Sequence, residues 1–258
     1  MTSSDSDVED PRPLSTRVYA DLRDRIIGGD LPLGSRLRER ELADTMGVSR
    51  VPLREALPQL EADGFITTAL RRGASVTQLT MRDVEELFEV RLGVEVYATR
   101  LAAIRVAEGA STEALREVLE RAVCAVEGED DVEMTERNAD LHEEIIRLAG
   151  NSLLSTMMRP VSGRDRWIFR MTAHRDPVVA CREHRELCEA IFAGRPDHAA
   201  ALAYAHIERG RVPTLETLRH VLPDDRTPRT VARATTPTQA PTRRLPLGSA
   251  ADHDEETP

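Results

Sequence analysis

The sequence contains no lysine, because all 35 of its basic residues are arginine. Nucleotide-binding P-loops, Schiff-base enzymes and pyridoxal enzymes each use a lysine amine, so these classes are excluded. Cysteine is also scarce. Cys124, Cys181 and Cys188 form no CxxC pair, and an odd number of cysteines is a poor basis for a disulfide framework. We therefore expect reduced thiols, as in a cytoplasmic protein.

Long apolar runs are absent as well. No stretch reaches the roughly 18 apolar residues of a membrane-spanning helix, and MTSSDSDVEDPRP lacks the apolar core of a signal peptide. The pattern predicts a soluble, cytoplasmic protein. The net charge of −10 argues against a general nucleic-acid coat. Residues 14–80 nevertheless hold ten arginines against nine acidic residues, a net charge of +1 that leaves −11 for the remainder.

A chain of 258 residues suits two domains. Residues 1–13 are acidic and rich in proline and serine, and residues 222–258 are rich in proline and threonine with almost no large apolar side chains. Neither segment can bury a core, so we predict a disordered lead and a disordered tail. Between them, residues 14–80 and 81–221 are the two predicted domains.

A helix, a tight turn and a second helix are predicted between residues 34 and 64. Gly47 can end the first helix in the left-handed conformation, and Ser49 is a candidate N-cap whose hydroxyl could accept a backbone N–H. Pro58 removes a hydrogen bond inside the second helix, which predicts a bend there. Two short strands around Arg71-Arg72-Gly73 complete a winged helix-turn-helix.

Arginines mark the surface of this motif that could read DNA. Arg50 and Arg54 lie one turn apart at the start of the second helix, and Arg40 lies on the first. A recognition helix enters the major groove through its N-terminal residues, where the arginine fork can pair with guanine. The candidate DNA-binding residues are Arg40, Ser49, Arg50, Arg54, Arg72 and Gly73.

The segment LRERELADTMGVSRVPLREAL, followed by DGFI and RRGASV, resembles the DNA-binding domain of the GntR family of bacterial transcription regulators. The resemblance covers about residues 14–80. It implies that Arg40, Arg50 and Arg54 contact DNA, that Gly73 lies at the minor groove, and that a homodimer binds an inverted repeat of double-stranded DNA. The alternative is a helix hairpin of other purpose with solvated surface arginines.

Beyond residue 80 only helical periodicity is found, which predicts an all-α bundle. Turn signals separate helices predicted near residues 82–105, 112–126, 132–149, 152–171, 177–193 and 196–218. The overall fold class is therefore mainly α, with an N-terminal winged helix-turn-helix and a C-terminal helical bundle.

Histidines supply the candidate chemistry of the bundle. His184 and His206 flank the turn at residues 194–196 at equal distances, so a helix hairpin would place both about 15 Å from the turn. Asn138 and His142 share one face of a third helix, whereas Asp140 points away. Three imidazoles and a side-chain oxygen from three helices can converge on a divalent metal.

A second resemblance concerns NADLHEEIIRLAGNSLL and EHRELCEAIFAGRPDHAAALAYAHI, which are similar to the FCD effector domain of FadR-type GntR regulators over about residues 81–211. The resemblance implies a metal held by Asn138, His142, His184 and His206. Zinc is expected, with nickel and manganese as alternatives. Asparagine departs from the aspartate commoner in the family. The remaining histidines match nothing and are predicted at the surface: His174, His198, His220 and His253.

Arg91 is a candidate anchor for the carboxylate of a small organic effector. A surface ion pair with Glu95, four residues on, is the equal alternative. The sequence thus predicts a repressor, not an enzyme, controlled by a small organic acid bound through a metal. A metal-responsive repressor and a metallohydrolase using the three histidines are the rival functions, and the hydrolase lacks an evident general base.

Overall fold

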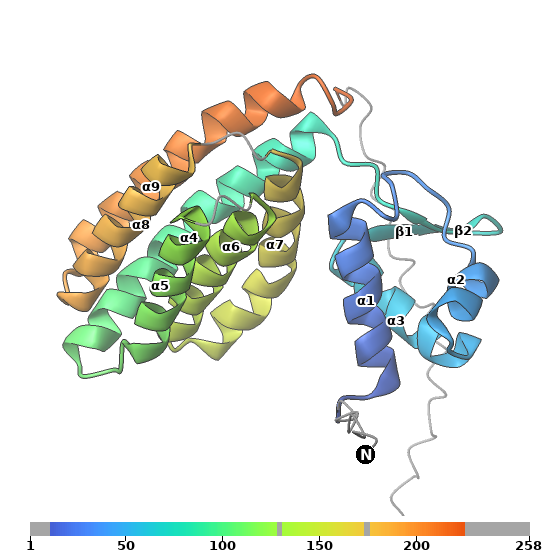
Figure 1. The fold of residues 1–258 in the computed structure, drawn as a ribbon, viewed down its shortest axis with the longest axis horizontal. Helices are drawn as coiled ribbons and strands as arrows, with labels where there is room; N and C mark the ends of the chain where they lie inside the picture. Colours follow the sequence, from blue (N-terminus) through green and yellow to red (C-terminus); the bar gives the residue numbers. More distant parts are fainter. Residues whose placement is uncertain (1–10, 128–130, 173–175, 225–258) are drawn as a thin grey trace, which may run out of the picture. The chain divides into compact units, whose positions relative to one another are not determined.

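The structure is a computed structural model that describes residues 11–127, 131–172 and 176–224 (Figure 1). Residues 14–76 form a winged helix-turn-helix and residues 81–218 a helical bundle, which confirms the predicted fold class. The elements are α1 (Leu14–Gly28), α2 (Glu39–Met46), α3 (Arg50–Ala62), β1 (Ile66–Ala69), β2 (Gly73–Val76), α4 (Met81–Ala107), α5 (Glu113–Glu127), α6 (Asp131–Leu148), α7 (Ser152–Met171), α8 (Pro177–Phe192) and α9 (Pro196–Leu218).

The core of the winged helix-turn-helix forms where α1 packs on α3. Apolar residues at helical spacing supply it, among them Leu22 and Ile26 of α1 with Leu53 and Leu60 of α3, and all four side chains are buried. Burying such side chains removes apolar area from water at roughly 25 cal/mol per Å². The core fixes the buried face of α3 and leaves the opposite face to solvent.

The tight turn between α2 and α3 follows the sequence prediction in part. Gly47 is left-handed, with φ 64°, and its N–H donates to the carbonyls of Ala43 and Asp44. Ser49 occupies the N-cap position with extended backbone, but its side chain makes no cap hydrogen bond, so the predicted role of its hydroxyl is wrong. α3 runs on past the exposed Pro58 to Ala62. The bend at that proline stays a prediction.

The wing is a two-stranded antiparallel hairpin. Ile66 pairs with Val76 and Ala69 with Gly73, so the predicted short strands are present, with four residues each. Arg71 and Gly73 at the turn have φ of 65° and 77°, a region in which a non-glycine residue is uncommon. The tight turn places the arginines of the wing tip in solvent.

The helical bundle is arranged around α4, which packs against α6, α7, α8 and α9 (Figure 1). Thr80 begins α4 with a complete capping box: its hydroxyl accepts from the N–H of Asp83, whose carboxylate accepts from the N–H of Thr80. Buried side chains from α5, α6 and α8 fill the space beside α4, including Leu115, Leu141 and Ile191. No helix among the described residues is long and apolar enough to cross a membrane.

The predicted hairpin of α8 and α9 is present. Gly194 turns the chain with φ 61°, and a Cβ there would stand 3.0 Å from the Cβ of Ala107. After α9 the chain stays packed further than predicted, because Leu222 is buried and the carbonyl of Pro223 accepts from the N–H of Met81. The rest of the predicted tail, from residue 225, and residues 1–10 of the predicted lead lie outside the described residues.

Candidate nucleic-acid interface and metal centre

The N-terminal turn of α3 presents two exposed arginines. Arg50 opens the helix, and Arg54 follows one turn later with a side chain that is 60% exposed. The Nε of Arg54 lies 2.7 Å from a carboxylate oxygen of Glu39 on α2. A surface ion pair of this kind contributes only about 0–1 kcal/mol. It can hold Arg54 in place without preventing the guanidinium from exchanging Glu39 for a base edge or a phosphate.

Other exposed candidates for DNA contact lie on α2 and at the wing tip. Arg40 on α2 has a side chain that is 89% exposed and stands 4.0 Å from Asp44, while Arg72 and Gly73 are exposed at the wing tip. Arg38, which the sequence analysis did not single out, is also exposed at the start of α2 and pairs with Glu41. Both α2 and the wing tip thus present exposed arginines, the residue type that contacts a phosphate backbone.

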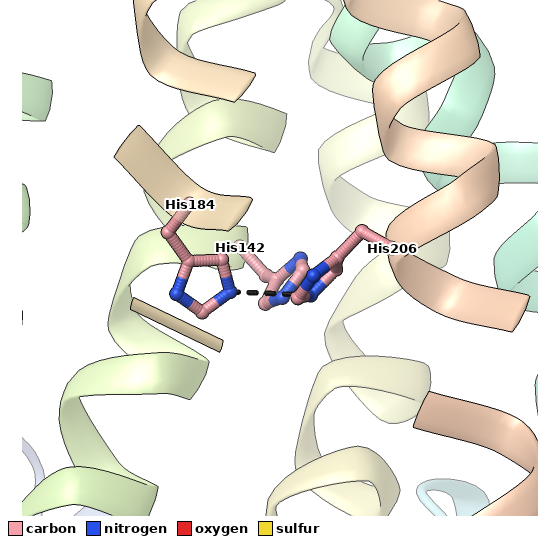
Figure 2. Close-up of side chains that lie close together, drawn as sticks. All are labelled: His142, His184 and His206. Atoms are coloured by element: carbon pink, nitrogen blue, oxygen red, sulfur yellow. Dashed lines mark hydrogen bonds between the residues drawn. The ribbon is translucent and has the colours of Figure 1, made fainter. Parts of the chain in front are cut away.

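The structure brings His142 of α6, His184 of α8 and His206 of α9 together (Figure 2). One ligand atom from each ring lies within 4.8 Å of the others, and all three residues are buried. The Nε2 atoms of His184 and His206 are 3.1 Å apart. Neighbouring nitrogens around a tetrahedral zinc ion are separated by roughly 3.3 Å, given Zn–N bonds of about 2.0–2.1 Å. The rings therefore have the spacing of a metal site.

Two of the three histidines have a buried carboxylate next to Nδ1 of the ring. The Nδ1 of His142 lies 3.2 Å from Oε2 of Glu95, and the Nδ1 of His206 lies 2.8 Å from Oε2 of Glu183. Glu183 was missed from the sequence, since its partner is on another helix and no motif joins the two. Histidine ligands in metalloproteins commonly have such a partner on the nitrogen that faces away from the ion.

The surroundings of Nε2 of His142 bear on whether these residues fit a metal ion. This atom is buried and has no hydrogen-bond partner among the described residues. An unsatisfied buried polar group costs roughly 1–3 kcal/mol, and a neutral imidazole nitrogen is a good ligand for zinc. The donor set and the orphaned nitrogen both suit a divalent metal of the zinc type.

Comparisons with known proteins cover both halves of the chain. The model of bacterial regulatory proteins of the gntR family matches residues 14–76, and that of the FCD domain matches residues 86–209. The HTH-type transcriptional regulator YdhC of Bacillus subtilis (strain 168), itself uncharacterised, is 30% identical over 84% of this chain and 96% of its own length. The chain belongs to the GntR family.

Two further relatives agree with this assignment. The gluconate operon transcriptional repressor of Bacillus licheniformis is 34% identical over 54% of this chain and 56% of its own. A crystal structure of a GntR transcriptional regulator from Rhodococcus sp. RHA1 is 27% identical, with a TM-score of 0.68 over 78% of this chain and 97% of its own. The protein is thus a GntR-type transcription regulator with an FCD domain, and not an enzyme.

In this GntR regulator Arg91 is deeply buried, with its side chain only 1% exposed. It donates to Glu95 from Nε at 2.8 Å, and its NH1 lies 2.9 Å from Asp165 of α7. The alternative pairing with Glu95 is therefore present, although it is buried instead of at the surface. The contact between Arg91 and an effector stays a prediction.

Two carboxylates share the one guanidinium of Arg91, and their pKa values move apart. Burial raises the pKa of Asp165 to about 8, because Arg91 offsets this only in part and Glu95 adds repulsion. Burial also acts to raise the pKa of Glu95, but Arg91 and His142 beside it bring it down to about 2. Burial lowers the pKa of Arg91, which its two carboxylates reverse, so Arg91 remains charged.

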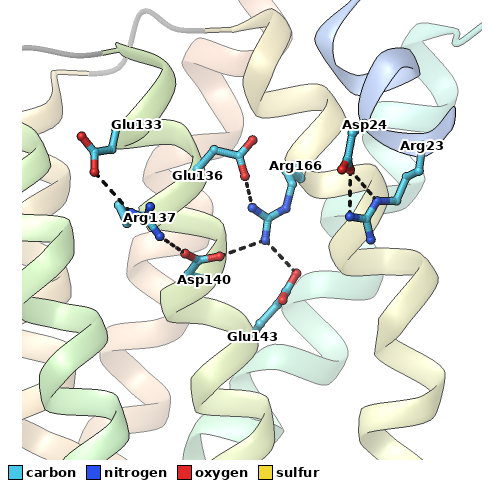
Figure 3. A network of polar contacts seen from close by, with 8 residues as sticks. All are labelled: Arg23, Asp24, Glu133, Glu136, Arg137, Asp140, Glu143 and Arg166. Atoms are coloured by element: carbon cyan, nitrogen blue, oxygen red, sulfur yellow. Dashed lines mark hydrogen bonds and ion pairs between the residues drawn. The ribbon is translucent and has the colours of Figure 1, made fainter. Parts of the chain in front are cut away.

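The acidic residues near His142 on α6 form ion pairs with arginines (Figure 3). Arg166 of α7 contacts Glu136, Asp140 and Glu143, and Arg137 lies 2.8 Å from Asp140. The carboxylate of Asp140, left out of the predicted ligand set, is engaged in this network. Asn138 is half-buried one turn before His142, and its bond to a metal stays a prediction.

Proposed function

We propose that this regulator is a homodimeric repressor that reads an inverted repeat and releases it when a small organic acid binds at the His142–His184–His206 site. The observation that supports the sensor is the convergence of three buried imidazoles with the orphaned Nε2 of His142. Repression is supported by the related gluconate operon protein, which is named a repressor. Arg50 and Arg54 are proposed to read bases, with Arg40, Ser49 and Arg72 as further DNA contacts and Gly73 at the minor groove.

The proposed cofactor is a divalent metal, with zinc first because three imidazoles suit it, and nickel or manganese as alternatives. When bound, the ion supplies a positive Lewis acid with open positions for a carboxylate. His142, His184 and His206 would hold it together with Asn138. All four ligands are neutral, so they do not offset the positive charge of the ion. An anionic effector would therefore be attracted by the full charge of the ion.

An apolar stripe on α4 supports the homodimer. Val90, Val94, Tyr97, Leu101 and Ile104 recur at alternating spacings of four and three residues, the repeat of helices that pair along a seam. Val90 and Tyr97 are 42% and 51% exposed. A stripe with this repeat is self-complementary about a two-fold axis, so we propose a second copy of the chain as its occupant.

The dimer is tested by light scattering with the Tyr97→Arg variant and a matched Tyr204→Arg control. Tyr204 lies on α9 and is 54% exposed, so both substitutions place a charge at a similarly accessible tyrosine. We expect Tyr97→Arg to give monomers at micromolar concentration and to lose operator affinity, because one half-site contributes far less than two. A Tyr97→Arg protein that remains a dimer would place the interface elsewhere.

The sensor is tested by elemental analysis of the purified protein, followed by a thermal-shift screen of small carboxylates with and without chelator. We expect bound metal and a carboxylate that raises the melting temperature only in the metal-loaded protein, since ligands of the folded state stabilise it. Operator release by that carboxylate supports an organic effector. Release caused by the metal alone, with no response to carboxylates, would instead favour the metal-responsive repressor.

A further inference from the structure

Two buried glutamates contact the Nδ1 atoms of two of the clustered histidines. Glu183 of α8 is buried and lies between two partners: its Oε2 is 2.8 Å from Nδ1 of His206, and its Oε1 accepts from Arg209 at 3.1 Å. Glu95 of α4 is buried and faces Nδ1 of His142 at 3.2 Å. In both cases the carboxylate and the histidine come from different helices, so tertiary packing sets the contact.

We infer that Glu95 and Glu183 are positioning residues, which hold His142 and His206 as Nδ1–H tautomers and so direct both Nε2 lone pairs at one metal ion. The inference rests on the proposed metal site. An ionised carboxylate can only accept a hydrogen bond, so the ring nitrogen that faces it carries the hydrogen. A neutral imidazole has a single N–H, which leaves its Nε2 as the free donor of electrons to a metal.

The same reasoning fixes the tautomer of His184. Its Nε2 lies 3.1 Å from Nε2 of His206. Because Glu183 keeps the hydrogen of His206 on Nδ1, the hydrogen shared by the two Nε2 atoms must come from His184. In the absence of metal, His142 and His206 are therefore Nδ1–H rings and His184 is an Nε2–H ring. The hydrogen bond between the Nε2 atoms of His184 and His206 is drawn in Figure 2.

An ion at this site would be held by the Nε2 atoms of the three rings, in place of the hydrogen bond between His184 and His206. For His184 this would require the proton to lie on Nδ1 instead of Nε2, with the ring neutral in both forms. His142 and His206 keep their tautomers throughout. One histidine of the three changes its proton position, while the other two are already arranged for the ion.

The two carboxylates also bear on the charge of the site. Glu95 and Glu183 put negative charge behind neutral ligands, which strengthens the basicity of the rings that bind the ion. Arg91 and Arg209 share these carboxylates and moderate the effect. Removing an outer partner of this kind typically weakens metal binding about 10–100-fold.

The first test uses the full-length, chelator-treated protein with ¹⁵N-labelled histidine, and long-range ¹H–¹⁵N correlation spectra assigned by single substitutions. We expect Nδ1–H tautomers at His142 and His206, an Nε2–H tautomer at His184, and a change of tautomer at His184 alone when Zn²⁺ is added. An Nε2–H tautomer at His142 or His206 in the metal-free protein overturns the inference. This reading holds even if Zn²⁺ fails to bind, an outcome that would refute the proposed metal site instead.

The second test compares Glu95→Gln and Glu183→Gln with Glu186→Gln, which alters an exposed residue of the same helix as Glu183. Affinity for Zn²⁺ is measured by competition with a zinc indicator. We expect each of the first two variants to bind about 10–100-fold more weakly, with mixed tautomers at the affected ring, because the glutamine amide can also donate. Glu186→Gln should match wild type. Unchanged zinc affinity and unchanged tautomers in Glu183→Gln would sink the positioning role.

Should a glutamine variant misfold, Glu183→Asp keeps the charge on a shorter side chain. It should restore the Nδ1–H tautomer of His206 and recover part of the zinc affinity. A structural role for the volume of Glu183 predicts the opposite order, with Glu183→Gln the better of the two variants.

Discussion

Replacing Asp165 with asparagine should change how the stability of the bundle depends on pH. Asp165 is 3% exposed and lies against Arg91, and burial raises its pKa from 3.8 to about 8. The folded state thus holds the Asp165 proton more tightly than the unfolded chain does. The resulting stabilisation is complete below pH 3.8 and is lost as the pH rises through about 8. Asparagine cannot ionise and so loses nothing over this range.

The size of the effect follows from the interval between the two pKa values. At about 1.4 kcal/mol per pKa unit, the ceiling is roughly 6 kcal/mol in the free energy of unfolding. Arg91 stays beside the ionised carboxylate, and buried sites relax and admit water, so we expect on the order of 3 kcal/mol. Glu95 does not interfere. Its pKa of about 2 makes its contribution present above pH 4.5 and lost only as the pH falls toward 2.

Urea unfolding of the chelator-treated protein between about pH 5 and pH 9 measures this difference. The free energy of unfolding of Asp165→Asn, relative to wild type, should rise steadily with pH and level off above about pH 8. Asp197→Asn is the control, since that carboxylate is 85% exposed in its pair with Arg100. Parallel profiles for wild type and Asp165→Asn would show that Asp165 holds no proton in the folded state.

Three further predictions concern DNA, metal and the chain end. Arg50→Ala and Arg54→Ala should each cost about 1–3 kcal/mol of operator binding and relax discrimination at one base pair; wild-type affinity of both at matched salt would count against α3 as the reading helix. Asn138→Asp adds a negative charge to the ligand set, so titrations should show tighter metal binding and weaker binding of the anionic effector. If neither affinity changes, Asn138 lies outside the ligand set. Ending the chain after residue 224 should leave the melting temperature unchanged, whereas ending it after residue 221 removes the buried Leu222 and should lower it; equal melting temperatures would contradict the packing of that residue.

Local patterns of the sequence were enough to predict the elements and the three histidines. Gly47 and Gly194 mark turns that only the left-handed conformation allows, and both are left-handed in the structure. Equal spacing from the turn at Gly194 places His184 and His206 at one level, and their Nε2 atoms are in contact. These predictions succeeded because each depends on the geometry of one helix or one hairpin.

The sequence could not predict contacts between side chains of different helices, because no sequence repeat relates the two residues. Glu183 meets His206 across α8 and α9, and Asp165 reaches Arg91 from α7. A helical wheel shows which face a residue occupies, but it does not show which side chain of another helix meets it. The capping hydroxyl of Ser49 failed for a related reason: residue type favours an N-cap, but only the side-chain rotamer decides whether the bond forms.

Because α4 contributes both to the metal site and to the proposed dimer seam, metal binding and dimerisation can be coupled through this helix. Glu95 lies on the side of α4 that supports the metal ligands, and Tyr97 with Leu101 lies on the opposite side, roughly 200–240° around the helix axis. If the helix moves when the ion binds, the same movement alters the proposed seam between two copies. By reciprocity, association of two chains must then change metal affinity by the same factor. The metal affinity of this regulator would therefore depend on its own concentration in solution.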